Sequence, residues 1–308
     1  MKILLTGGTG FIGTHVVKEL LARKHALTLI VREPNKIPSY KREPQITLIQ
    51  GDFTDPMIVK AGLKGQDALI HLALGNIGNA VDTVKNDLVP SIYILETAAL
   101  MGVKKILSTT TVGVYGDAND KYGENCAAKP VSMYSATKEA AKAFAYAIYK
   151  TYGVAVNTIE PALIFGYAAV EGGTINRLEG RFFDIIRLAR KNENIKIKKN
   201  HGTQFLEASD IAKVYADVIE SNKAGRSYLA MGAEYMDWGE VARIVVDYIG
   251  SKSRIILGTE GIGVSGVKDA WKNYPADISA IREDFGREFP VREKLTEYLK
   301  WLCDTWNE

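Results

Sequence analysis

Residues 1–13, MKILLTGGTGFIG, join an apolar strand to a glycine-rich turn and the first residues of a helix. The glycines follow the spacing G-x-x-G-x-x-G, which permits a tight turn, a close approach of backbone to phosphate, and close packing of helix on strand. The unpaired N–H groups and the positive dipole end of the expected helix, residues 11–23, face this turn. Glycine-rich turns also occur where nothing binds, but the stretch favours a dinucleotide pyrophosphate site made of Gly7, Gly10, Phe11, Ile12 and Gly13.

The apolar run at residues 26–31 is typical of a parallel strand that is buried on both faces. After such a strand, an acidic residue holds the adenosine ribose of NAD, whereas a basic residue accommodates the 2′-phosphate of NADP. Arg32 follows the strand here, with Lys36 close behind, and this favours NADP over NAD as the cofactor. The alternative is that Arg32 is a solvated loop residue and that Glu33 contacts the ribose.

Strands and helices alternate through the first half of the chain. Further strands are expected at residues 46–50, 68–73, 104–111 and 155–162, with long helices at 80–101 and 133–152. This alternation predicts an α/β fold with a Rossmann-type doubly wound parallel sheet, which binds its ligand at the carboxyl ends of the strands. Candidate cofactor contacts at or near those ends are Asp52, Phe53, Leu72, Ala73 and Pro161. His71 lies within an apolar strand and is expected to be a hydrogen-bonded core histidine.

The second half of the chain is less regular, with helices expected at about 177–191, 209–220, 237–249 and 292–305. No repeat, low-complexity tract or obvious linker divides it. We expect a Rossmann domain of residues 1–166, to which residues 207–222 return. A smaller C-terminal α/β lobe, residues 167–206 and 223–308, would bind the substrate.

The composition is that of an ordinary globular protein, with 308 residues, 46% of them hydrophobic and 24% charged. These values exclude a disordered or fibrous chain, and a net charge of +3 is too small to indicate a nucleic-acid surface. Cys126 and Cys303 form neither a C-x-x-C pair nor a disulfide framework, which suits a reducing cytoplasm. The N-terminal apolar run is too short for a signal peptide and no later run approaches twenty residues, so we expect a cytoplasmic protein that is not anchored to a membrane. No metal site is expected.

Tyr134 and Lys138 are four residues apart, which places a phenol and an ammonium on one face of the helix at 133–152. A nearby positive charge favours the phenolate, so we expect Lys138, helped by an oxidised nicotinamide, to lower the pKa of Tyr134 from about 10. The same spacing recurs in Tyr146/Lys150 and Tyr248/Lys252. Tyr134 alone begins a helix soon after a strand that ends in three threonines, residues 109–111, and its position therefore selects it.

Together these motifs resemble those of the extended short-chain dehydrogenase/reductases, in the group of sugar-nucleotide epimerases and dehydratases. The matching stretches are residues 6–13, 51–52, 108–116, 134–138, 210–212 and 298–301, so the resemblance spans nearly the whole chain. It implies hydride transfer between a substrate carbon and nicotinamide C4. In that reaction Thr111 would hydrogen-bond the substrate oxygen, Tyr134 would exchange the hydroxyl proton, and Lys138 would hold the cofactor ribose. Tyr134 is also a candidate cofactor contact.

The chain departs from the family pattern where substrate would bind. An Asp-Glu pair usually follows the catalytic threonine in the dehydratases, whereas Val112 and Gly113 stand here, so we do not expect dehydratase chemistry. Thr203 replaces an arginine that often clamps the diphosphate of uridine-type sugar nucleotides, and a second such arginine is missing before Ala276. Either other cations hold a diphosphate or the substrate carries no nucleotide. The candidate substrate-binding residues are Thr111, Asn176, Arg177, Arg181 and Thr203.

The resemblance implies an NAD(P)-dependent epimerase or oxidoreductase that acts on a sugar nucleotide or a related hydroxyl or carbonyl substrate. Arg32 and the missing arginines favour the alternative of an NADPH-dependent reductase of a small non-nucleotide carbonyl. A dinucleotide-binding sensor without turnover is a third hypothesis, which the intact pair of Tyr134 and Lys138 disfavours. The resemblance also implies a homodimer formed through the helices at 80–101 and 133–152.

Overall fold

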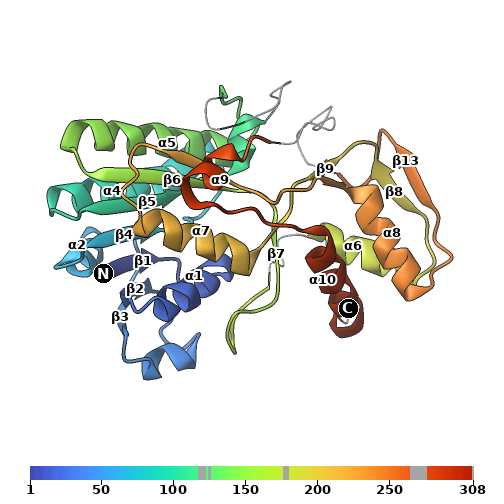
Figure 1. The fold of residues 1–308 in the computed structure, drawn as a ribbon, viewed down its shortest axis with the longest axis horizontal. Helices are drawn as coiled ribbons and strands as arrows, with labels where there is room; N and C mark the ends of the chain where they lie inside the picture. The colour runs from blue at the N-terminus through green and yellow to red at the C-terminus, as the bar shows by residue number, and fades with distance from the viewer. Residues whose placement is uncertain (117–122, 124–125, 176–179, 264–275, 307–308) are drawn as a thin grey trace.

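Seven parallel strands form one central sheet in the computed structural model, which describes residues 1–116, 123, 126–175, 180–263 and 276–306 (Figure 1). The strand order is β11-β6-β5-β4-β1-β2-β3, and every neighbouring pair is parallel. The strands are β1 (Lys2–Thr6), β2 (Ala26–Val31), β3 (Ile46–Gln50), β4 (Ala68–His71), β5 (Lys105–Thr109), β6 (Ala155–Pro161) and β11 (Ser227–Ala230). The predicted Rossmann-type sheet is confirmed, and its order reverses between β1 and β4, where such folds bind their ligand.

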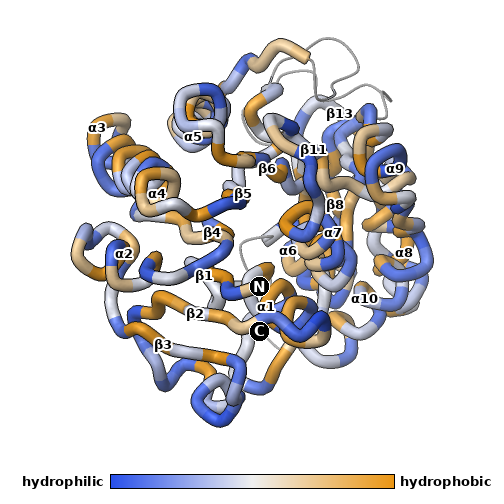
Figure 2. Tube along the Cα trace, turned by 60° about the vertical axis from the view of Figure 1, so that its left-hand side comes forward, coloured by the Kyte–Doolittle hydropathy of each residue, from blue (hydrophilic) through white to orange (hydrophobic). Residues whose placement is uncertain are grey.

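Helices cover both faces of the sheet. One face carries α1 (Phe11–Ala22) and α7 (Ala208–Glu220), and the other carries α2 (Pro56–Leu63), α4 (Val89–Leu100) and α5 (Met133–Tyr152) (Figure 1). Side chains along β1 alternate between the two cores, since Ile3 and Leu5 pack on the α1 side and Leu4 on the α5 side. Burial on both faces explains the continuous apolar run of β2, which is mostly orange in Figure 2.

Local signals explain where helices begin and end. Ser132 and Ser135 form a reciprocal capping box at the start of α5, and Gly153 ends the helix with φ +66°. The helix expected at 80–101 is divided instead into α3 (Ala80–Thr83), the π-helical turn η2 (Val84–Leu88) and α4. Pro90 has no N–H to bond the carbonyl of Asn86, so a regular α-helix cannot continue through this point.

A second hydrophobic core lies beside the sheet. It is built from α6 (Gly180–Arg190), α8 (Trp238–Ile249), α10 (Arg292–Thr305) and the parallel strands β8 (Ile195–Lys198) and β13 (Ile255–Gly258) (Figure 1). At its centre the rings of Phe182, Phe205 and Trp238 pack with centroids 5.3–5.9 Å apart. The elements of this core fall within residues 167–206 and 223–308.

The assignment of all residues 223–308 to the lobe is corrected by the structure. β11 pairs with β6 in the central sheet, and α9 (Ser279–Phe285) packs against β11. β11 has four residues, all buried, so its sequence carries no alternation that would distinguish a sheet strand from a lobe strand.

Short elements complete the described fold. β7 (Ile164–Phe165) pairs with β10 (Leu206–Glu207), and β9 (Gly202–Thr203) pairs with β12 (Met236–Asp237). The 3₁₀ turns are η1 (Pro38–Arg42) and η3 (Val112–Tyr115). Within the described ranges no helix is long and apolar enough to cross a bilayer, and no group of three potential metal ligands is found.

Candidate active site

The glycine turn between β1 and α1 leaves no room for side chains. Gly7 has φ +77°, and a Cβ on it would lie 2.8 Å from the backbone nitrogen of Ala73. A Cβ on Gly13 would lie 2.1 Å from the carbonyl oxygen of Gly7. Gly10, the residue before α1, provides no side-chain cap, so the first N–H groups of the helix keep their capacity to bind an anion. The turn therefore fits a bound pyrophosphate.

Two cavities meet at this turn, with volumes of about 620 Å³ and 580 Å³. Both are lined by Gly7, Gly10, Leu72 and Ala73. We call the larger one the Arg32 cavity, and its other predicted residues are Arg32, Asp52 and Phe53. We call the smaller one the Tyr134 cavity, and its other predicted residues are Phe11, Ile12, Gly13, Thr111, Tyr134, Lys138, Pro161, Arg181 and Thr203. Every described candidate thus lines one cavity or both, whereas Asn176 and Arg177 lie outside the described residues.

Arg32 stands at the end of β2, with its side chain 74% exposed. Its Nε lies 4.0 Å from Asp52 Oδ2, which is a loose pair at an exposed position and contributes little to stability. Lys36 also lines the Arg32 cavity, and Glu33 is exposed and is not among the lining residues. The geometry thus places cations, rather than Glu33, beside this cavity.

Thr111 and Tyr134 come from separate elements and meet in the Tyr134 cavity. Thr111 precedes η3 and its hydroxyl oxygen accepts the N–H of Gly113 at 3.1 Å, which fixes the side chain. The Thr111 hydroxyl also hydrogen-bonds the phenol of Tyr134, in the first turn of α5. One turn further along α5, Lys138 Nζ lies 5.9 Å from the centroid of the Tyr134 ring. The three predicted catalytic side chains are therefore adjacent.

The expected lowering of the Tyr134 pKa by Lys138 is not what the structure shows. Burial raises the pKa of Tyr134, the hydrogen bond from Thr111 lowers it, and the negative charge of Asp87 raises it. Lys138 Nζ contacts Asp87 Oδ2 at 2.9 Å, so the positive charge of Lys138 is compensated beside the phenol. The protein groups in the structure thus favour a neutral phenol.

His71 is a core residue, as predicted. Its ring nitrogens hydrogen-bond the hydroxyls of Thr6 at 2.7 Å and Ser91 at 3.0 Å. Burial lowers the pKa of His71 to about 3, so the ring is neutral near pH 7. These two hydrogen bonds anchor the ring at the end of β4.

Comparison with known proteins decides the family. The model of the NAD dependent epimerase/dehydratase family matches residues 3–231. The chain belongs to this family. The matched region includes all seven strands of the central sheet except the first residue of β1. The resemblance to the extended short-chain dehydrogenase/reductases is confirmed.

Curated relatives of this chain align with nearly its whole length. UDP-glucuronic acid decarboxylase 6 of Arabidopsis thaliana is 26% identical over 321 residues, covering 97% of this chain and 87% of that protein. A 3 beta-hydroxysteroid dehydrogenase/Delta 5→4-isomerase of Mycobacterium tuberculosis is 25% identical, covering 100% and 92%. The crystal structure of UDP-glucuronic acid 4-epimerase from Bacillus cereus shares the fold, with a TM-score of 0.80 at 19% identity over 99% of this chain and 98% of that one. The chain is accordingly an NAD(P)-dependent enzyme of the extended short-chain dehydrogenase/reductase type.

The far wall of the Tyr134 cavity combines Trp238, which sequence reasoning missed, with the predicted Arg181 and Thr203. Trp238 begins α8 and is fully buried, and the guanidinium of Arg181 lies 4.4 Å from the centroid of its ring. Arg181 also donates to the carbonyl of Gly263 at 3.2 Å, and Thr203 lies buried in the same wall. A single aromatic residue at the start of a helix gives no signal of this role, because most such residues only pack in a core.

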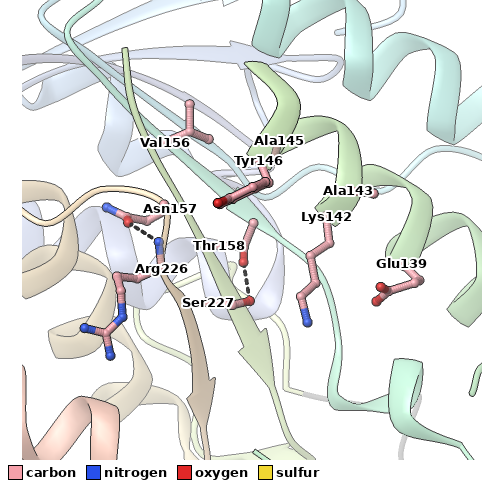
Figure 3. Close-up of a pocket in the computed structure, with 11 residues that line it drawn as sticks. Glu139, Lys142, Ala143, Ala145, Tyr146, Val156, Asn157, Thr158, Arg226 and Ser227 are labelled. Carbon is pink, nitrogen blue, oxygen red and sulfur yellow. Dashed lines mark hydrogen bonds between the residues drawn. The ribbon is translucent and has the colours of Figure 1, made fainter. Parts of the chain in front are cut away.

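A third cavity of about 580 Å³ lies between α5, β6 and β11 and shares no lining residue with the other two. In Figure 3, Lys142 and Glu139 project from α5 beside the hydroxyls of Thr158 and Ser227, which hydrogen-bond each other at 2.5 Å. Lys142 Nζ forms an ion pair with Glu160 Oε1 at 2.7 Å, and the Glu160 side chain is fully buried. These contacts connect α5 to β6 and the edge strand β11, and we assign them a structural role.

Replacing Lys142 with methionine is expected to lower the free energy of unfolding by about 3–5 kcal/mol, because it leaves the buried Glu160 carboxylate without its counter-charge. Urea unfolding measures the change. The double variant Lys142→Met/Glu160→Gln removes both charges and should recover most of the loss. Equal destabilisation of the single and the double variant would contradict the importance of the pair.

Proposed function

We propose that this enzyme transfers a hydride between nicotinamide C4 and a substrate carbon, acting as an epimerase or oxidoreductase on a sugar nucleotide or a related hydroxyl or carbonyl compound. The observation that carries the proposal is the meeting of Thr111, Tyr134 and Lys138 in a cavity that begins at the glycine turn. A bound dinucleotide would donate or accept the hydride. The protein's own residues would exchange the proton and align the substrate.

Each side chain has a role that its contacts permit. The Thr111 hydroxyl, already fixed by the N–H of Gly113, would hydrogen-bond the substrate oxygen. Tyr134 would give a proton to a carbonyl oxygen during reduction and take one during oxidation. A phenol whose pKa is raised by burial is protonated at neutral pH, which favours the donating role. Lys138 lines the same cavity, where its ammonium would hold the cofactor ribose.

Nucleotide sugars are the substrate class that the relatives favour. The relatives of this chain include a UDP-glucuronic acid decarboxylase and a dTDP-glucose 4,6-dehydratase. Arg181, stacked on Trp238, supports the proposal by supplying a cation to the far wall where Thr203 replaces the family arginine. Val112 and Gly113, in place of the Asp-Glu pair, argue against dehydratase chemistry.

Reduction of a small non-nucleotide carbonyl is the second candidate, favoured by Thr203 and by the exposed cation Arg32. Binding of UDP and dTDP, measured by calorimetry, separates the two. Tight binding that competes with substrate supports a sugar nucleotide. Absence of binding by either nucleotide moves the proposal to the small carbonyl.

We infer that NADP is the preferred cofactor, because Arg32 and Lys36 line the cavity that would receive the adenosine ribose. The opposing consideration is that the solved structures of similar fold include complexes with NAD. Identifying the nucleotide released when the fresh protein is denatured addresses both cofactor and reaction. Retained, stoichiometric NAD would indicate an epimerase that recycles its cofactor, and it would contradict the inference from Arg32.

Replacing Arg32 with alanine is expected to weaken NADPH binding by about 10- to 100-fold, since a hydrogen bond to a charged group contributes about 1.5–3 kcal/mol. NADH binding should stay nearly unchanged because NADH lacks the 2′-phosphate. Fluorescence titration of the emptied protein measures both. Glu33→Ala is the matched control and should alter neither affinity; equal loss of both cofactors in Arg32→Ala would contradict phosphate recognition.

We also propose a homodimer through α4 and α5, which pack side by side on one face of the sheet. Large apolar side chains are exposed on both helices, among them Leu100 at 68%, Met133 at 56% and Phe144 at 47%. Elution at monomer mass across a range of concentrations would contradict the dimer. A cytoplasmic location stays a prediction.

A further inference from the structure

The catalytic lysine has a buried acidic partner. Lys138 Nζ lies 2.9 Å from Oδ2 and 3.2 Å from Oδ1 of Asp87, and the two side chains are 6% and 2% exposed. Among the described residues, Asp87 is the one carboxylate that contacts Lys138. The positive charge of Lys138 and the negative charge of Asp87 therefore offset each other in a site shielded from water.

The fold holds Asp87 in this position from two directions. Asp87 lies in the π-helical turn η2, directly before α4. Its Oδ1 also accepts the N–H of Gly75 at 2.9 Å, and a Cβ on Gly75 would lie 1.9 Å from the carbonyl oxygen of Asn86. The loop after β4, which lines both cavities, is thus pressed directly onto η2.

We propose that Asp87 is a positioning residue of the active site, which holds Lys138 against the Tyr134 cavity and offsets its positive charge beside the Tyr134 phenol. The proposal rests on the proposed function for the proton-transfer role of Tyr134. An ammonium has three N–H donors, so Lys138 can contact Asp87 and still present a donor to the cavity. Without the carboxylate, the lone positive charge would favour the phenolate.

The other titratable groups near this site do not supply a compensating charge. His71, from β4, faces the pair of Lys138 and Asp87 and is neutral, with its pKa lowered to about 3 by burial. Tyr215, from α7, faces Tyr134; burial raises its pKa, and its hydroxyl hydrogen-bonds Thr109 at 2.8 Å. Within the described residues, the charge beside Tyr134 is accordingly set by Lys138 and Asp87.

Replacing Asp87 with asparagine is expected to lower the titration midpoint of Tyr134 by about 1–3 pH units, because one opposing charge has been removed. The ¹³Cζ resonance of labelled tyrosine, assigned by its loss in Tyr134→Phe, reports the midpoint without any substrate. Asp87→Glu keeps the charge and should keep the midpoint near that of the wild type. The pH profile of carbonyl reduction should move down with the midpoint in Asp87→Asn.

Two variants control the experiment. Glu160→Gln removes the partner of Lys142, one turn further along α5, and should leave the Tyr134 midpoint unchanged. The double variant Asp87→Asn/Lys138→Met removes both charges without leaving either one unpaired, and its midpoint should return toward the wild-type value. If Asp87→Asn alone does not fold, the double variant is compared with Lys138→Met instead. The Tyr134 midpoint should be higher in Lys138→Met than in the double variant, because Lys138→Met leaves the negative charge of Asp87 unpaired.

An unchanged midpoint in folded Asp87→Asn, or equal midpoints in Lys138→Met and the double variant, would overturn the proposal. A shifted midpoint in a protein that turns over no sugar nucleotide or carbonyl would support the role of Asp87. That result would count against the proposed function alone, because the resonance needs no turnover.

Discussion

Replacing Tyr134 with phenylalanine is expected to lower kcat by about 100- to 10,000-fold, the range typical of losing a positioned acid or base. The substitution removes the hydroxyl that hydrogen-bonds Thr111 and leaves the ring in place. Thr111 can still bond the substrate oxygen but cannot complete the proton transfer. With UDP-glucuronic acid as the first substrate tested, reduced nicotinamide absorbance measures oxidation or reduction, and chromatographic separation of product from substrate measures epimerisation. Cofactor titration should show nearly unchanged affinity.

Tyr146→Phe is the matched control for this experiment. Tyr146 lies on the same helix, also stands four residues before a lysine, and is 52% exposed outside the Tyr134 cavity. It should keep the wild-type kcat. Full turnover by Tyr134→Phe would refute the acid–base role, whereas equal losses in both variants would point to damage to α5 rather than to lost chemistry.

The glycine turn and the Tyr134 helix could be predicted from sequence because their requirements are local. Gly7 is needed for a positive φ and Gly13 for a close backbone contact, and both needs are visible in the residue type and spacing. Tyr134 was distinguished from two other tyrosines by its distance from β5 and by its place at the start of a helix. These features do not depend on how distant elements pack.

Asp87 could not be predicted because its direction depends on a helix irregularity. Each residue advances an α-helix by about 100°, so the extra residue of a π-helical turn rotates the following side chains onto another face. Asp87 lies within this turn, so the regular helix expected over residues 80–101 does not give the direction of its side chain. The charge opposite Lys138 follows from this local change, whereas burial is the main cause of the raised Tyr134 pKa.

The contact between Arg181 and Trp238 in the far wall could not be predicted for a different reason, although Arg181 itself was a candidate substrate-binding residue. Arg181 and Trp238 come from α6 and α8, which meet only when the second core forms. Their contact joins residues 57 positions apart, from 181 to 238, with no shared motif. Substrate recognition is for this reason the part of the site that the sequence defines least.

Replacing Gly13 with alanine is expected to weaken dinucleotide binding on the order of 100-fold, about 2.7 kcal/mol, although alanine is intrinsically better than glycine within a helix. The added Cβ would lie 2.1 Å from the carbonyl oxygen of Gly7 and 2.9 Å from the Cα of Gly8. Both contacts are with backbone atoms, so no rotamer change can relieve them. The start of α1 must therefore move away from the glycine turn, and its N–H groups would move with it. Titration with NADPH and NADH measures the loss, and Gly258→Ala, whose Cβ meets no atom within 4 Å, should bind both normally. Wild-type affinity in Gly13→Ala would show that the turn tolerates a wider separation of helix and strand, and the anion site would then depend on groups other than the start of α1.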